Sequence, residues 1–152
     1  MKNFWTIATA VLLGITVNAQ DASPRNRHFN LEKGLAMEGY DPVSYFNGKP
    51  VEGSGEYAVN HQGAVYYFAS AANADKFKKD PSKYEPQYGG WCAYAMGAKG
   101  EKVSVDPETY KVIDGKLYLF YNRFFNNTLE DWNEDEARLK AKADANWNKI
   151  NR

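Results

Sequence analysis

Alternating apolar and polar positions mark two short hairpins in this chain. Residues 56–60 and 64–68 alternate on either side of a His-Gln-Gly turn, a pattern typical of a β-hairpin. Residues 110–113 and 116–121 alternate in the same way about an Asp-Gly dipeptide, which favours a two-residue hairpin loop. Together the two hairpins predict a small, mostly antiparallel sheet.

Three other segments have helical features. Residues 71–79 follow Ser70, whose hydroxyl suits a helix cap, and end at an Asp-Pro pair. Residues 92–98 follow two glycines and end among further glycines, which predicts a short helix. Residues 128–150, with Thr128 as cap, predict one long helix that docks on the sheet. Its apolar stripe consists of Trp132, Leu139, Ala143, Trp147 and Ile150. We therefore expect an α+β fold, in which short helices and a long C-terminal helix pack against the sheet.

The N-terminal residues have the pattern of a secretory signal. Lys2 precedes an uncharged stretch over residues 4–17, and a Val-Asn-Ala motif before Gln20 suits cleavage at that point. The stretch is shorter than the roughly 20 residues that a membrane-spanning helix needs. We therefore expect residues 1–19 to be a signal peptide, and the protein to be exported to the periplasm or the extracellular space with no membrane association after cleavage.

The rest of the chain suits one domain. Residues 20–35 are expected to be a polar lead-in, loose in its first part, and residues 36–152 a single domain. Within that domain, residues 39–46 are expected to be extended, with an Asp-Pro bend. The sequence shows no internal repeat and no low-complexity tract.

Charge and motif content restrict the classes of function. The chain has 19 basic and 19 acidic residues, and removal of residues 1–19 takes away only Lys2, which leaves 18 basic against 19 acidic residues. This balance argues against nucleic acid as a partner. The sequence contains no Ser/His/Asp arrangement, no convincing pair of carboxylates and no HExxH motif. We therefore assign no catalytic residue, and the sequence does not favour an enzyme.

Cys92 is the single cysteine of the chain, within the run Gln-Tyr-Gly-Gly-Trp-Cys-Ala-Tyr-Ala. An exported protein with one cysteine cannot form an internal disulfide. The thiol is therefore a buried apolar group, a ligand, or a reactive group whose thiolate would gain from the start of the following helix. Packing is favoured, because a free cysteine is among the most frequently buried residues.

Aromatic and soft side chains near Cys92 supply the candidate binding residues. The candidates for a small-ligand pocket are Cys92, Tyr67, Tyr88, Trp91 and Tyr94. The candidates for a copper site of Cys/His/Met type are Cys92, Met96 and His61, with His28 as a further donor. Met96 lies four residues after Cys92, so the two residues share a helical face. They are expected to share either a ligand or a contact in the core.

Several motifs, in this order, resemble those of the YHS domain family. They are Gly-Tyr-Asp-Pro-Val-Ser-Tyr-Phe at 39–46, Tyr-Tyr-Phe-Ala-Ser at 66–70, and the later Asp-Pro pair. The Gln-Tyr-Gly-Gly-Trp-Cys-Ala run at 87–93 and Asp-Gly-Lys-Leu-Tyr-Leu at 114–119 are similar to the exported bacterial branch of that family. The resemblance covers about residues 36–150. It implies kinship with small metal-binding modules of heavy-metal transport ATPases and of some monooxygenase components.

The departures from that family concern its thiolates. Where metal-binding relatives have cysteine, this chain has Ser44, Ala69 and Asn73. None of these side chains is a good ligand for Cu(I) or Zn(II), so we expect no tightly bound zinc.

These observations lead to three hypotheses. The first is an exported binding module, without enzymatic activity, for a transition metal or small ligand near the Tyr-Gly-Gly-Trp-Cys-Ala-Tyr-Ala segment. The second is a thiol-dependent redox protein that uses Cys92, and the third is a protein-interaction domain without a small-molecule site. The sequence does not identify the ligand, and it leaves copper open as a cofactor.

Overall fold

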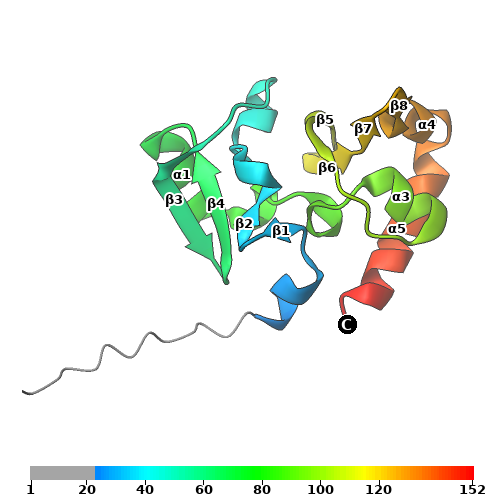
Figure 1. Ribbon diagram of the computed structural model, residues 1–152, viewed down its shortest axis with the longest axis horizontal. Coiled ribbons are helices and arrows are strands. Elements are labelled where there is room, and N and C mark those ends of the chain that lie inside the picture. The colour runs from blue at the N-terminus through cyan, green and yellow to red at the C-terminus, as the bar shows by residue number, and fades with distance from the viewer. Residues whose placement is uncertain (1–22) are drawn as a thin grey trace, which may run out of the picture.

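A computed structural model of the chain describes residues 23–152 (Figure 1). The predicted signal peptide and its cleavage point lie outside these residues. The strands are β1 (Leu31–Glu32), β2 (Leu35–Ala36), β3 (Ser54–His61), β4 (Ala64–Phe68), β5 (Asp106–Ile113), β6 (Lys116–Phe120), β7 (Asn122–Arg123) and β8 (Asn126–Asn127). The α-helices are α1 (Ala71–Lys79), α2 (Pro81–Tyr84), α3 (Ala93–Lys99), α4 (Thr128–Glu134) and α5 (Glu136–Ile150). Short 3₁₀ turns are η1 (Pro24–His28), η2 (Met37–Gly39), η3 (Ser44–Asn47) and η4 (Gln87–Gly90). The predicted α+β class is confirmed.

Both predicted hairpins form, but they belong to separate sheets. In the first half of the chain the strands follow the order β1-β2-β4-β3, in which only the β2–β4 pair is parallel. The second predicted hairpin, β5–β6, is a two-stranded sheet of its own. Figure 1 shows the four-stranded sheet with α1 at one end of the molecule, and β5–β6 with α3, α4 and α5 at the other.

Helix α1 begins and ends as its sequence predicts. The Ser70 hydroxyl accepts a hydrogen bond from the Asn73 N–H at 3.1 Å, which caps the first turn. Asp80 ends α1 and caps the single turn of α2 in the same way, through the Lys83 N–H. Phe77 of α1 is fully buried against the four-stranded sheet, in contact with Tyr66 of β4.

The prediction of one long C-terminal helix is wrong at Asp135. This residue has φ −150° and ψ 50°, and it separates α4 from α5. The first turn of α4 is capped by the side chain of Asn127 and not by Thr128, whose hydroxyl instead donates to the Tyr121 carbonyl at 2.8 Å. Helix α5 packs mainly on α3 and not on a sheet, because Gly97 lets the two helices come close. A Cβ atom on Gly97 would lie 2.5 Å from the Leu139 carbonyl oxygen.

The buried apolar residues form two clusters. The sheet cluster surrounds β4 and α1 and includes Tyr45, Tyr66, Phe68, Phe77, Cys92 and Leu117. The helical cluster lies between α3, β6, α4 and α5 and consists of Tyr88, Ala93, Met96, Tyr118, Phe120, Trp132, Leu139 and Ala143. Neighbouring residues of α3 and β6 therefore contribute to different clusters, and these two elements join the halves of the protein.

The segment from Tyr40 to Asn47 is less extended than predicted. Tyr40 pairs with Glu52 as an antiparallel bridge, but residues 44–47 form the turn η3. Asp41 causes the turn, because its carbonyl oxygen accepts hydrogen bonds from both the N–H and the hydroxyl of Ser44, at 3.1 and 2.6 Å.

The described part of the lead-in is attached to the body of the protein. Residues 24–28 form the turn η1, and Arg25 pairs with Glu85 at 2.5 Å. The Asn30 N–H donates to the Gly89 carbonyl oxygen at 2.9 Å. The expectation of a loose segment is therefore wrong for residues 24–27. Among the described helices, none has both the length and the apolar character that crossing a membrane requires.

Candidate functional site

The loop before Cys92 has an unusual backbone. Tyr88, Gly89 and Gly90 all have positive φ, at 56°, 60° and 85°. A Cβ atom on Gly89 would lie 2.8 Å from the Trp147 ring, so this position requires glycine for space as well as for its dihedral angle. The loop therefore turns sharply against α5 and leads the chain into α3.

Cys92 lies directly before α3, and its side chain is fully buried. The Tyr121 N–H points to Sγ at 3.4 Å, and Sγ lies 3.4 Å from Oγ1 of Thr128. The Thr128 hydroxyl already donates its proton to the Tyr121 carbonyl, so the thiol is the donor in the Cys92–Thr128 contact. Both functions of the thiol, donor and acceptor, are thus used inside the fold. The thiol makes no capping bond to α3.

A cavity of about 260 Å³ opens beside this thiol. We call it the Cys92 cavity. Its walls come from α3, from the loop after α3, and from the residues around β7–β8: Cys92, Tyr94, Ala95, Ala98, Lys99, Glu101, Val103, Tyr121, Asn126 and Thr128. The walls are mainly apolar, while charged groups stand only at Lys99 and Glu101. Such a space suits a small ligand with an apolar body and one polar end.

Of the predicted pocket residues, the structure brings only Cys92 and Tyr94 to this cavity. Tyr88 is buried in the helical cluster, where its hydroxyl donates to Asp144 at 2.9 Å. Burial, helped by this hydrogen bond to a carboxylate, raises the pKa of Tyr88 well above its ordinary value. Trp91 donates its indole N–H to the His28 carbonyl at 2.7 Å. Tyr67 lies on β4, on the opposite face of that strand from Tyr66 and Phe68.

The structure does not bring the copper candidates together. Met96 is fully buried in the helical cluster, whereas Cys92 belongs to the sheet cluster. His61 ends β3 and packs edge-on against Phe77, with ring centroids 5.8 Å apart. His28 contacts Lys102 through Nδ1. Within residues 23–152, no three His, Cys, Asp or Glu side chains are grouped in a way that could hold a metal ion.

Asp41 organises a second polar centre, which sequence reasoning interpreted only as a turn residue. Its fully buried carboxylate accepts three hydrogen bonds, from the Val43 N–H at 2.8 Å, the Ala69 N–H at 2.9 Å and the Asn73 side-chain amide at 2.7 Å. Ser44 bonds to the carbonyl of the same residue. The three positions at which the family resemblance implies cysteine in metal-binding relatives therefore meet around one residue, Asp41: Ser44 at its backbone carbonyl, Ala69 and Asn73 at its carboxylate. Here they form a hydrogen-bonded clip between η3, the end of β4 and the start of α1. Two features of the sequence could have indicated this centre: the Asp-Pro-Val-Ser run, and the position of Asn73 in the first turn of a capped helix.

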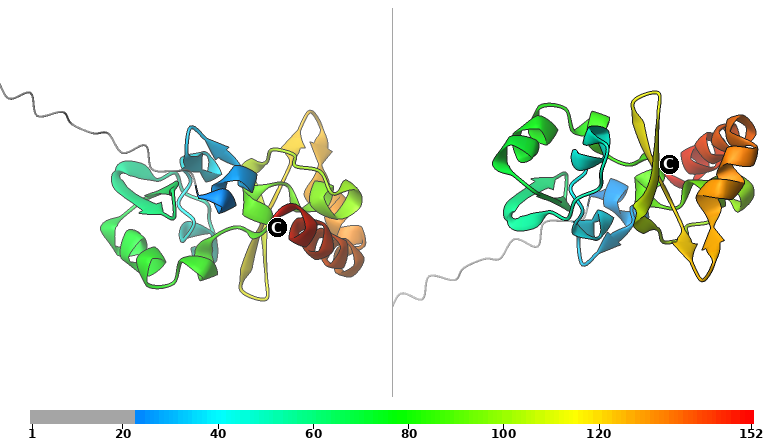
Figure 2. Two further views of the ribbon diagram at one scale, coloured as in Figure 1. Left: turned by 90° about the horizontal axis from the view of Figure 1, so that it is seen from below. Right: turned by 90° about the horizontal axis from the view of Figure 1, so that it is seen from above.

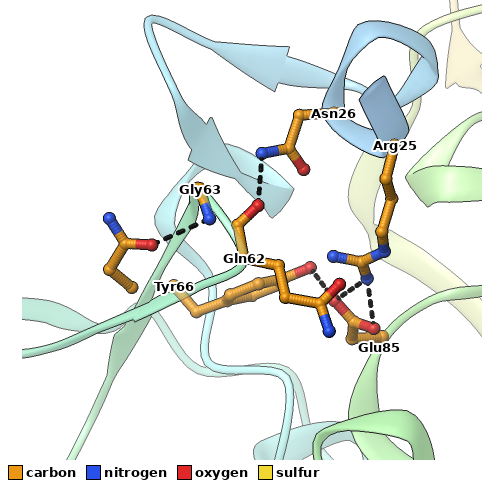
Figure 3. Close-up of polar contacts among 7 residues, drawn as sticks. Arg25, Asn26, Gln62, Gly63, Tyr66 and Glu85 are labelled. Carbon is orange, nitrogen blue, oxygen red and sulfur yellow. Dashed lines mark hydrogen bonds and ion pairs between the residues drawn. The ribbon is translucent and has the colours of Figure 1, made fainter. Parts of the chain in front are cut away.

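A third polar group connects η1 to the four-stranded sheet (Figure 3). The Arg25 guanidinium donates to both carboxylate oxygens of Glu85, and the Tyr66 hydroxyl donates to Glu85 at 2.7 Å. Asn26, beside Arg25, donates its amide to the Gln62 carbonyl at 2.7 Å. These contacts fasten η1 to the body of the protein. Glu85 is paired through Nη2 of Arg25, whereas Nη1 of Arg25 and Oδ1 of Asn26 are buried without a hydrogen-bond partner among the described residues.

Comparison with known proteins places one segment of the chain in a family. Neither the curated proteins nor the solved structures gave a significant match. The family model of the YHS domain matches residues 42–88, which run from the residue after Asp41 through β3, β4, α1 and α2 to Tyr88. The match includes Ser44, Ala69 and Asn73, and it ends four residues before Cys92. Residues 42–88 of this chain are a YHS domain.

Proposed function

We propose that the protein is an exported binding module, and that its ligand is a small, largely apolar molecule bound in the Cys92 cavity. The observation that carries this proposal is the cavity itself, an apolar space of about 260 Å³ beside a buried thiol and Tyr94. A cavity of about 150 Å³ in another protein is enough to bind benzene, so the space here suits a ligand at least of that size.

The chemistry of the walls limits the ligand. Ala95, Ala98 and Val103 offer apolar contact, and the Tyr94 ring adds a flat surface. Lys99 and Glu101, which have opposite charges, leave no strong net field. A ligand with an apolar body and one uncharged polar group fits these walls better than a phosphate or a metal ion does.

The hydrogen bonds of Cys92 support a role as part of the wall. A nucleophilic thiol needs access and a group that takes its proton, whereas this thiol is fully buried and donates to Thr128. The same burial separates it from Met96 and His61, so a copper site of the predicted type would require rearrangement of both clusters. The cavity also lies after residue 88, outside the matched YHS segment, and the metal role of that family therefore does not bear on it.

The export part of the proposal depends on the N-terminal sequence. The positive start, the uncharged stretch over residues 4–17 and the Val-Asn-Ala motif support cleavage before Gln20. N-terminal sequencing of protein recovered outside the cytoplasm is expected to begin at Gln20. Recovery of chains that still begin at Met1 from a membrane fraction would contradict export in this form.

Native mass spectrometry tests the ligand. Protein purified from the cells that produce it is expected to carry a bound organic mass, which is released on denaturation and is absent from Ala98→Trp. Ala98 lies exposed at the rim of the cavity, so a tryptophan at this position fills the cavity without disturbing the core. The matched control is Ala141→Trp, an exposed alanine on α5 away from the cavity. If no mass is bound, or if the mass persists in Ala98→Trp, the proposed ligand site is wrong.

A further inference from the structure

Two phenylalanines form the tip of the β7–β8 hairpin and contribute nothing to either core. Phe124 is 89% exposed and Phe125 is fully exposed. They belong to neither apolar cluster, and no ring of the described residues stacks on them. Figure 2 shows the hairpin projecting beyond the body of the protein. Large apolar side chains in such a position are available for contact with another surface.

The backbone of the tip is also unfavourable for these residues. The two-residue loop has φ 54° at Phe124 and 62° at Phe125, a combination usually found with Asn-Gly or Asp-Gly. Bulky side chains rarely adopt this region. The fold therefore holds two large rings outward in strained conformations and gains no intramolecular contact in return.

An apolar recess that suits such a ring lies next to the tip on the same molecule. Asn126, the residue after Phe125, is part of the wall of the Cys92 cavity. With about 260 Å³, the cavity has room for one phenyl ring, since about 150 Å³ holds benzene elsewhere. The projecting group and the recess that fits it are thus side by side.

We propose that two copies of the chain form a twofold dimer, in which the Phe124–Phe125 tip of each copy packs on the other and one ring enters its Cys92 cavity. In each copy the tip lies next to the cavity. A twofold axis between two copies therefore brings each tip to the cavity of the other copy, and both contacts form at once. A buried aromatic side chain removes about 150–250 Å² from water, so four rings remove about 600–1,000 Å². Because the tips pack on each other, the rings bury one another, and the cavity walls add only the small area that faces the inserted ring. The total of roughly 1,000 Å² is that of a weak, transient interface, in keeping with association at micromolar concentrations.

The charge around the tip favours a protein surface over a lipid surface. Glu130, Asp131 and Glu134 follow the hairpin on α4, and Arg123 is the basic residue of the hairpin itself. Acidic groups close behind the rings would be repelled by an anionic membrane. The dimer uses the cavity of the proposed ligand but does not depend on that ligand; a bound ligand and the ring of a second copy would compete.

Sedimentation velocity on protein purified as the cell processes it tests the dimer. The ligand-free wild type is expected to change from monomer to dimer across micromolar concentrations, while protein that carries the ligand is expected to stay monomeric. The double variant Phe124→Ser/Phe125→Ser is expected to raise the dimer dissociation constant at least about tenfold, and Ala98→Trp, which fills the recess, is expected to do the same. The matched control, Val51→Ser/Val112→Ser, removes two exposed apolar side chains elsewhere and should leave association unchanged.

Three results would overturn the proposal. They are a ligand-free wild type that stays monomeric throughout, a dimer that persists in the double serine variant, and binding of the tip to phosphatidylcholine vesicles in place of a second copy. Circular dichroism confirms that each variant is folded. The ligand mass is measured on the same samples, so loss of the dimer and loss of the ligand are scored separately.

A mixed cross-link tests the geometry directly. Phe125→Cys protein mixed with Ala98→Cys protein is expected to form a disulfide between copies under mild oxidation. Val112→Cys, whose side chain is also exposed, replaces Phe125→Cys in the control and should give no cross-link with Ala98→Cys. Equal cross-linking of the two pairs would refute the proposed arrangement.

Discussion

Replacement of Asp41 by asparagine tests whether the hydrogen-bonded clip holds the YHS domain together. The change keeps the shape of the side chain but leaves one acceptor oxygen where the carboxylate has two. The carboxylate accepts from Val43 on one oxygen and from Ala69 and Asn73 on the other. At least one buried N–H therefore loses its partner and faces an amide NH₂ group.

The magnitude follows from these three bonds. An unsatisfied buried donor costs about 1–3 kcal/mol, and a hydrogen bond to a charged group is worth about 1 kcal/mol more than a neutral one. One lost bond and two weakened bonds give a loss of about 3–5 kcal/mol in the free energy of unfolding for Asp41→Asn. Asp75→Asn is the matched control, because Asp75 is exposed on α1, and its change is expected within about 0.5 kcal/mol.

Chemical denaturation measures this loss, and amide hydrogen exchange locates it. Exchange at the Ala69 N–H is expected to accelerate in Asp41→Asn more than exchange in α5, because the clip lies in the half of the protein built on the four-stranded sheet. A loss below about 1 kcal/mol, or an acceleration spread evenly over the chain, would show that the carboxylate is not the organising group.

Three further changes test other parts of the structure. Gly97→Ala should lower the free energy of unfolding by about 1–3 kcal/mol through the contact with the Leu139 carbonyl, although alanine has the higher helix propensity; a stabilised variant in denaturant titrations would show that α3 and α5 are not closely packed. Burial and the Glu85 hydrogen bond raise the pKa of Tyr66 above its ordinary 10.0, so its contribution to stability is complete below pH 10 and falls above it. Between about pH 9 and 11.5 the fall in stability of the wild type should steepen, and above about pH 11 the slope should be about 1.4 kcal/mol per pH unit shallower for Tyr66→Phe than for the wild type; equal slopes there would count against this assignment. Cys92 should react with a thiol reagent only as fast as the protein unfolds, and rapid labelling of the native state at neutral pH would restore the redox hypothesis.

Elements whose signals are local were predictable from the sequence. The β3–β4 and β5–β6 hairpins and α1 agree with prediction because turn dipeptides, alternation and a serine cap act within a few residues. The break at Asp135 had no such signal, since neither glycine nor proline interrupts residues 128–150. There the packing of Trp132 and Leu139 into one cluster decides the path of the chain.

The candidate site was predicted only at its centre. Cys92 and Tyr94 line the cavity, and they lie two residues apart at the point where the loop enters α3. Met96 is on the same helix but faces the other cluster, since the boundary between the two cores runs through α3. Other parts of the wall, such as Val103 and Tyr121, reach the cavity through long-range packing that no local pattern encodes.

The attachment of η1 has a consequence for the order in which the protein folds. Arg25 and Asn30 are among the first described residues, yet their partners Glu85 and Gly89 follow about 60 positions later. As a chain leaves a ribosome or a translocation pore from its N-terminus, this segment waits without a partner until α2 and η4 have emerged. Closure of so long a loop is slow compared with formation of a local hairpin, so the segment docks after the body of the protein has formed. A bulky group fused just before η1 would therefore delay the last stage of folding while leaving the first hairpin free to form.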